Sequence, residues 1–140
     1  MNAMFQRSLL SFGIACLLVL FCACAESKSS LKSLVRDVEA YHKDLIFERY
    51  EIAAKHIAPE SRGDWLEALI SQNLKFSEIE IVSSQDCTKS TPDAPTCICI
   101  ISRVQWYANA SPVVKTNRLH TVWQFDEDQK SWFLVEQTQL

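Results

Sequence analysis

The sequence predicts an α+β fold in which three N-terminal helices pack on a four-stranded antiparallel curved sheet. Apolar residues recur at helical spacing from Leu31 to about Asn73, and from there to Thr138 they alternate with polar residues at the period of a strand. A run of helices followed by a run of strands is typical of an α+β domain. The chain of 140 residues, 48% of them hydrophobic, is long enough for one such domain with one core.

Each helix is indicated by an apolar stripe. The first covers about residues 31–45, with Ser29 or Ser30 as its N-cap. A short second helix ends near Ile57, and Pro59 lies in the first turn of a third helix, where its missing N–H costs nothing. The expected inward side chains are Leu31, Leu34, Val35, Val38, Tyr41, His42, Leu45, Phe47, Tyr50, Ala53, Ala54, Ile57, Trp65, Leu66, Leu69, Ile70 and Asn73.

Four strands follow: about Lys75 to Ser84, Cys97 to Tyr107, a third containing Arg118 to Phe125, and a last one containing Trp132 to Val135. Matching the apolar faces of neighbouring strands predicts their register, because a slip of one residue would turn every side chain to the other face. The expected cross-strand pairs are Ile79 with Val104, Ile98 with Trp123, Ile100 with Thr121, Arg103 with Arg118, Ala108 with Val113, Val122 with Val135, Trp123 with Leu134 and Phe125 with Trp132. Which face of the sheet the helices cover stays open at this point.

The N-terminus is typical of an exported protein. Leu9 to Ala23 contains no charge, Asn, Gln or Pro, and its roughly fifteen residues are fewer than the roughly twenty that a spanning helix needs. The run ends in Leu20-Phe21-Cys22-Ala23-Cys24, which resembles the bacterial lipobox, with Cys24 at the invariant cysteine. The alternatives are an ordinary cleaved signal peptide, cut after Ala23 or Ala25, and a retained transmembrane anchor.

The lipobox resemblance implies a lipid anchor and a location. Residues 1–23 would be the lipoprotein signal peptide, and Cys24 would carry a diacylglycerol and an amide-linked acyl chain such as palmitate. Several acyl chains hold a protein firmly on a membrane, whereas one does not. Ala25 stands where an Asp would retain the protein at the inner membrane, so the resemblance implies the outer membrane, with the domain facing the periplasm. Residues 24–30 would be a polar tether and residues 31–140 the folded domain.

Cys87, Cys97 and Cys99 remain in the mature chain, in an oxidising compartment if export is correct. A disulfide from Cys87 to Cys97, or to Cys99, would close the loop between the first two strands. The predicted register offsets Cys87 from Cys97 by one residue, which a β-bulge near the loop would reconcile. Cys97-Ile98-Cys99 lacks a second Cys/His pair at ligand spacing, so we expect no metal site, and the sequence indicates no cofactor.

One face of the predicted sheet collects charge. Arg103 faces Arg118, with His120 one step along, and the register of the first strand brings Glu78 and Glu80 beside Arg103. The line is a solvated ion-pair ladder, an anion site formed by Arg103, Arg118 and His120, or a contact with another copy of the chain. The net charge of −3 and the absence of a clustered basic face argue against nucleic-acid binding.

The domain also resembles the nuclear transport factor two-like superfamily, to which ketosteroid isomerase belongs. Members of this superfamily share a cone-shaped, cystatin-like α+β roll. The resemblance rests on Tyr50 to Ile57, Pro59, Arg62, Trp123 to Phe125 and Lys130 to Val135. It implies an inward carboxylate base and an oxyanion donor if the chain is an isomerase-like enzyme. Inward candidates are Tyr41, His42, Tyr50 and Tyr107, with Glu136 the sole carboxylate candidate on a strand.

These observations favour a non-catalytic, membrane-anchored envelope lipoprotein that presents a small α+β domain for protein interaction or self-association. The alternatives are a small-molecule binder or ketosteroid-isomerase-like enzyme that uses the cone, and a factor that works only within a larger complex. An interior filled by tryptophan would argue against the enzyme, whereas an enclosed cavity with an inward carboxylate or histidine would favour it.

Overall fold

The computed structural model describes residues 31–87 and 96–138. Cys24 and the residues predicted to form the signal peptide and the tether therefore lie outside the described residues. The chain divides into two compact units, residues 1–35 and 36–140. Of the first unit only residues 31–35, the start of a helix that continues to residue 46, are described. Within the described residues no helix is long and apolar enough to cross a membrane.

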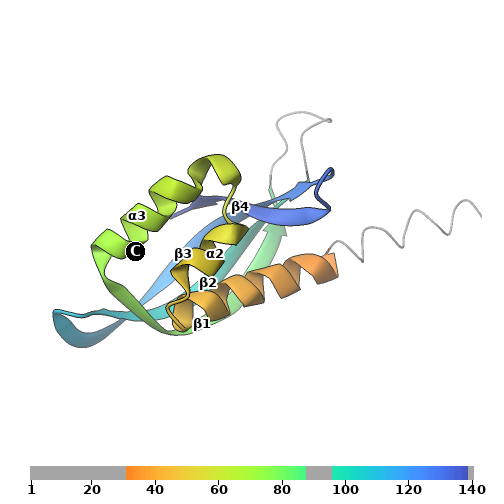
Figure 1. The fold of residues 1–140 in the computed structure, drawn as a ribbon. Helices are drawn as coiled ribbons and strands as arrows, with labels where there is room; N and C mark the ends of the chain where they lie inside the picture. The colour runs from red at the N-terminus through yellow and green to blue at the C-terminus, as the bar shows by residue number, and fades with distance from the viewer. Residues whose placement is uncertain (1–30, 88–95, 139–140) are drawn as a thin grey trace, which may run out of the picture. The chain divides into compact units, whose positions relative to one another are not determined.

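The unit that spans residues 36–140 is α+β, with a four-stranded antiparallel sheet as predicted (Figure 1). The strands are β1 (Leu74–Asp86), β2 (Cys97–Ala108), β3 (Ser111–Asp126) and β4 (Ser131–Gln137). Their order in the sheet is β1-β2-β3-β4, so each strand pairs with the next one in sequence. This meander leaves β1 and β4 as the two edges.

The predicted register is confirmed through the centre of the sheet. The pairs found as expected are Ile79 with Val104, Ile98 with Trp123, Ile100 with Thr121, Arg103 with Arg118, Trp123 with Leu134 and Phe125 with Trp132. The expected bulge in β1 is also present, between Ile81 and Ser83. It moves the pairing by one residue, so that Asp86 lies opposite Ile98 and the chain reaches Cys87 beside Cys97.

Two expected pairs are wrong, each because of a further bulge. Val122 lies opposite Glu136 instead of Val135, since the register shifts between Val122 and Trp123. Ala108 lies opposite Ser111 instead of Val113, since β2 and β3 shift beyond Trp106 and close in a tighter turn. β3 therefore begins earlier than predicted and includes Pro112, which a strand tolerates near its start.

Helical residues precede the sheet, and the second and third predicted helices are more broken than expected. α2 covers only Tyr50–Ala53 and continues as a 3₁₀ turn at Ala54–His56. Another 3₁₀ turn, Pro59–Ser61, leads into α3 (Arg62–Gln72). Five side chains expected to point inward are exposed instead: Leu31 by 51%, Val35 by 48%, Phe47 by 62%, Ile70 by 58%, and Asn73.

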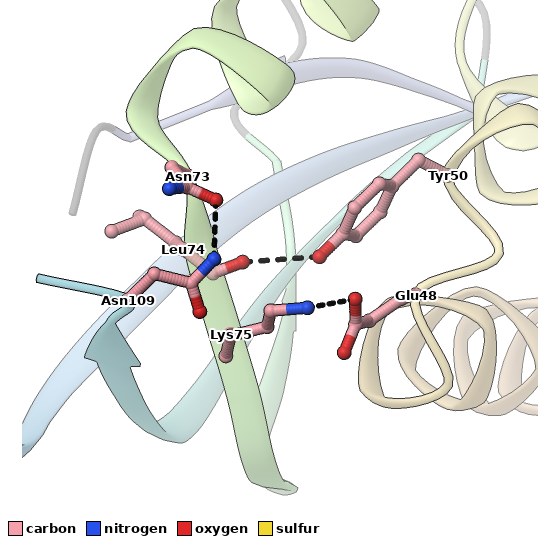
Figure 2. Close-up of polar contacts among 6 residues, drawn as sticks. All are labelled: Glu48, Tyr50, Asn73, Leu74, Lys75 and Asn109. Carbon is pink, nitrogen blue, oxygen red and sulfur yellow. Dashed lines mark hydrogen bonds and ion pairs between the residues drawn. The ribbon is translucent and has the colours of Figure 1, made fainter. Parts of the chain in front are cut away.

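The junction between α3 and β1 is held by polar contacts (Figure 2). Asn73 ends α3 in the left-handed conformation, at φ 51° and ψ 41°, which asparagine tolerates better than most residues. Its side-chain oxygen accepts a hydrogen bond of 2.7 Å from the amide of Asn109 in the β2–β3 turn. Next along the chain, the Leu74 carbonyl accepts a bond of 3.0 Å from the Tyr50 hydroxyl, and Lys75 pairs with Glu48. These contacts tie α2, α3 and the β2–β3 turn to the start of β1.

The core lies between the helices and one face of the sheet, here called the inner face (Figure 1). This is the face that bears the buried tryptophans. Trp123 is 0% exposed and Trp132 is 2% exposed. The segment after the first 3₁₀ turn joins the β4 edge, where the Ala58 N–H donates to the Leu134 carbonyl at 2.9 Å. The opposite face of the sheet, here called the outer face, bears Cys99, Ile101 and Arg103 on β2 with Val122, His120 and Arg118 opposite them on β3.

The packing predicts that Trp123→Ala lowers the free energy of unfolding by about 3 to 5 kcal/mol, because it removes a fully buried aromatic ring and leaves a cavity. Urea denaturation of the full chain measures the change. Val113→Ala is the control, since Val113 is 63% exposed and its truncation should cost less than about 0.5 kcal/mol. Equal losses for the two variants would contradict the assignment of the core.

Candidate functional site

Tyr41 is the centre of the interior. Its side chain is fully buried, and its hydroxyl donates a hydrogen bond of 2.6 Å to Oε1 of Gln137 on β4. Four rings of the described residues lie around it, with centroids 5.7 Å away for Trp123, 5.8 Å for His42, 6.0 Å for Trp65 and 6.2 Å for His56. Burial raises the pKa of Tyr41 far above its ordinary value, and a hydrogen bond with Trp65 only partly opposes this effect. The hydroxyl therefore stays protonated and acts as a hydrogen-bond donor.

His56 lies at the rim of this aromatic cluster, half-buried, with its ring 6.4 Å from that of Trp123. Burial lowers the pKa of His56, while the charges of Asp37 and Asp44 raise it in part. The Asp44 carboxylate is itself buried and pairs with Arg49 at 2.7 Å.

The isomerase-type pairing of an inward carboxylate and a phenol is not assembled at the expected residues. Tyr41 supplies an inward hydroxyl, but Glu136, the expected strand carboxylate, is exposed. The inward side chain near the end of β4 is Gln137, an amide that does not titrate in the accessible pH range. The sequence did not predict that Gln137 and His56 point into this cluster. Gln137 points inward because a bulge shifts the register of β4. His56 does so because it lies in the 3₁₀ turn that follows α2.

A pocket of about 430 Å³ opens between residues 39–46 of the first helix and β1. Its lining is Glu39, His42, Lys43, Ile46, Ile79, Glu80 and Ile81. His42 is the buried polar group, 5% exposed, and its Nε2 lies 3.5 Å from the Ser102 hydroxyl. Burial lowers the pKa of His42 to about 4, so the imidazole is neutral near pH 7. The Ser102 hydroxyl is fully buried and so is shielded from anything bound in the pocket.

The charged residues predicted on the sheet lie on its outer face. Arg103 lies opposite Glu80 on β1 and opposite Arg118 on β3, which gives the expected line of one carboxylate and two guanidinium groups. Glu80 forms an ion pair with Arg103, and each side chain is more than half exposed. Such a pair contributes about 1 kcal/mol or less. Glu80 thus supplies the counter-charge for Arg103, while His120 is exposed and lies opposite Ile101.

The cysteines lie at the other end of the β1–β2 hairpin. A disulfide joins Cys87 to Cys97, whose Cα atoms are 5.5 Å apart, and Cys99 is reduced. The Cys87 N–H donates to the Cys97 carbonyl at 3.1 Å, so the two residues face each other across the strands. Among the described residues no group of three or more His, Cys, Asp or Glu side chains is placed to hold a metal ion.

Comparison with known proteins shows a likeness of fold alone. No protein-family model and no curated protein matches the sequence. A solved structure of a protein from Catenulispora acidiphila superposes with a TM-score of 0.54 over 80% of this chain and 91% of its own, at 9% identity. The intermembrane space region of the chloroplast protein ARC6 gives a TM-score of 0.43 over 76% of this chain and 93% of its own, at 10% identity. Identities this low carry no function from either protein to this one.

The burial of His42 predicts a loss of stability in acid. The folded state protonates His42 near pH 4, whereas the unfolded chain does so near 6.5, so the unfolded chain binds more protons between these values. The stability due to neutral His42 is complete above pH 6.5 and declines as the pH falls towards 4, by about 3 kcal/mol in all. Urea denaturation at a series of pH values measures the slope.

His42→Gln should flatten this slope, because glutamine does not titrate. Part of the slope should remain, since burial also lowers the pKa of His56. Val113→Ala is the control, because Val113 is 63% exposed and carries no titratable group, so the substitution should leave the slope unchanged. The explanation is wrong if His42→Gln retains the full pH dependence of the wild-type chain.

Proposed function

We propose that this protein is a non-catalytic lipoprotein of the bacterial cell envelope. In this proposal it is anchored through Cys24 to the outer membrane, and its domain, facing the periplasm, binds a protein partner or a second copy of itself. We further propose that residues 31–140 form a cone-shaped roll of the nuclear transport factor two-like kind, with the helices covering the concave side of the sheet. The order of helices and strands and the antiparallel meander support this finer assignment of fold.

The observation that carries the proposal is the contrast between the two faces of the sheet. The inner face is packed with aromatic side chains, and the Tyr41 and Trp123 side chains are fully buried there. The outer face bears partly exposed Ile101, Val122 and Phe133, here called the outer apolar strip. None of the described helices packs on these side chains, and apolar side chains at a sheet surface beside charged residues are typical of interaction surfaces. The outer apolar strip, and not the packed inner face, is therefore the candidate surface for binding a partner.

The proposal of a lipid anchor rests on the N-terminal sequence. The run from Leu9 to Ala23 followed by Cys24 matches the order of signal peptide and acceptor cysteine in exported lipoproteins. Two or more acyl chains would bind the membrane firmly, since each buried CH₂ contributes about 0.8 kcal/mol. Residues 24–30 would leave the domain tethered at the membrane surface.

A small-molecule binder is the second candidate, and the pocket beside His42 is the observation that favours it. At about 430 Å³ the pocket lies in the range of ligand sites, and Ile79 and Ile81 give it an apolar wall. An isomerase-like reaction would also need an inward base. His42 is neutral near pH 7 but has a pKa of about 4, which makes it a weak base. Binding is thus better supported than catalysis at this pocket.

Cys24→Ala tests the anchor. We expect the full chain with Cys24 to partition with membranes and to incorporate labelled palmitate, and the variant to lose both properties because it has no acceptor thiol. Cys99→Ala is the control, since it removes a cysteine of the folded domain and should leave acylation and partitioning unchanged. Unchanged acylation and membrane partitioning of Cys24→Ala would refute the lipid anchor.

Site-specific photo-crosslinking in cells tests the interaction surface. A photoreactive residue in place of Val122, within the outer apolar strip, should give discrete adducts heavier than the monomer. The same residue in place of Val113, which is 63% exposed in the β2–β3 hairpin, is the control and should give none or far fewer. Adduct mass distinguishes a second copy from another protein. Absence of adducts at position 122, or an equal pattern at both positions, would contradict the proposed surface.

A further inference from the structure

Three cysteine sulfur atoms lie together at the end of the β1–β2 hairpin. Cys87 Sγ is bonded to Cys97 Sγ, and the Sγ of reduced Cys99 lies 3.1 Å from Cys87 Sγ. All three residues are half-buried, so solvent can reach the group. A thiol this close to one sulfur of a disulfide is placed to attack it, because exchange proceeds by a thiolate approaching a disulfide sulfur.

The strand register explains why the three sulfur atoms meet. Cys87 faces Cys97 directly, as the bond from the Cys87 N–H to the Cys97 carbonyl shows. Cys99 is two residues further along β2 and opposite Gln85, so its side chain is on the same face of the sheet as that of Cys97. Cys87 therefore has one direct and one diagonal cysteine neighbour.

We propose that Cys87, Cys97 and Cys99 form an internal thiol–disulfide exchange site. The Cys99 thiol gives its proton to solvent, and the resulting thiolate attacks Cys87 Sγ. The Cys87–Cys99 bond forms as the Cys87–Cys97 bond breaks, and the electron pair of the broken bond leaves with Cys97 Sγ, which then takes a proton from solvent. One disulfide is exchanged for another, so the step needs no oxidant and no reductant.

The geometry restricts the exchange to these two isomers. Residues two apart on one strand have parallel Cα–Cβ bonds, so their Cβ atoms stay about 6.6 Å apart, far beyond the roughly 3.8 Å between the Cβ atoms of a disulfide. Cys97 therefore does not bridge readily to Cys99. The direct pair is favoured at equilibrium, because its Cα separation of 5.5 Å is within the usual disulfide range. A diagonal pair begins about 7 to 8 Å apart and needs the strands to shift by about 1 Å. The Cys87–Cys99 isomer is therefore the minor one.

The exchange moves the free thiol between two positions. It is at Cys99, within β2, in the major isomer and at Cys97, the first residue of β2, in the minor one. A thiol-reactive molecule would thus modify either residue, although the structure contains a single reduced cysteine in this group. This inference does not rest on the proposed envelope function, because it depends only on the folded hairpin with its disulfide intact.

Alkylation of the purified, non-reduced full chain with iodoacetamide tests the exchange. Peptide mapping reads each cysteine separately, including Cys16, Cys22 and Cys24. We expect label at both Cys99 and Cys97 in the wild-type chain. Labelling should be faster at higher pH, because only the thiolate reacts. Label at Cys99 alone, after complete reaction, would overturn the proposal.

Three variants make the test specific. Cys99→Ser removes the attacking sulfur, so labelling of Cys97 should fall at least about tenfold if exchange with Cys99 is its source. Cys97→Ser should form the Cys87–Cys99 disulfide under air, which protects both residues from label. Cys87→Ser removes the shared sulfur and defines full labelling of Cys97 and Cys99. Persistent Cys97 label in Cys99→Ser, or two free thiols in Cys97→Ser, would overturn the proposal.

Discussion

The fully buried Tyr41 hydroxyl, which donates to Gln137 at 2.6 Å, constrains the rest of the structure. A phenol without a partner in this position would cost about 1 to 3 kcal/mol, so the helix that carries Tyr41 and the end of β4 must be held in one arrangement. The rings of Trp65 and Trp123 pack around the phenol and fill the space beneath the helix. These side chains stabilise the fold and fill the space around Tyr41. The candidate functional features are therefore expected at the surface.

Matching of apolar faces predicts much of the sheet from the sequence. Burial of one face makes a register slip costly, and the alternating runs around Val104 and Trp123 each allow one good alignment. That same alignment places Glu80, Arg103 and Arg118 in one line across the strands. The positions of these charged residues on the outer face can be predicted because the apolar side chains next to them in sequence, which point inward, determine the register.

The bulges and short helical turns could not be located in the same way. A bulge inserts one residue without changing the composition of the strand, so the shift at Val122 that places Glu136 opposite it leaves no clear trace in the sequence. His56 belongs to a 3₁₀ turn, where a period of 3.6 misplaces side chains. Ile70 was misassigned because α3 buries a narrower stripe than its composition suggests, with Leu69 its one buried side chain. For the cysteines, the sequence left both pairings of Cys87 open, and the proximity of all three sulfur atoms gives that ambiguity a physical basis.

The proposed exchange site and the outer apolar strip share strand β2. Cys99 lies opposite Val122, and Ile101 is the next residue on the same face. The proposed interaction surface and the reactive thiol are therefore neighbours on the outer face of the sheet. The pocket beside His42, by contrast, opens between the first helix and β1 and shares no lining residue with the outer apolar strip, although Glu80 both lines the pocket and pairs with Arg103.

The proposed anchoring of this domain to the bacterial envelope through Cys24 can be tested by measuring the intact mass of the mature protein extracted from membranes. Cleavage before Cys24, addition of the diacylglycerol and acyl groups, and loss of two hydrogens for one disulfide each change that mass by a distinct amount. We predict a chain beginning at Cys24 with all three changes present. The mass of the unprocessed chain of 140 residues, or of a cleaved chain without lipid, would contradict the account.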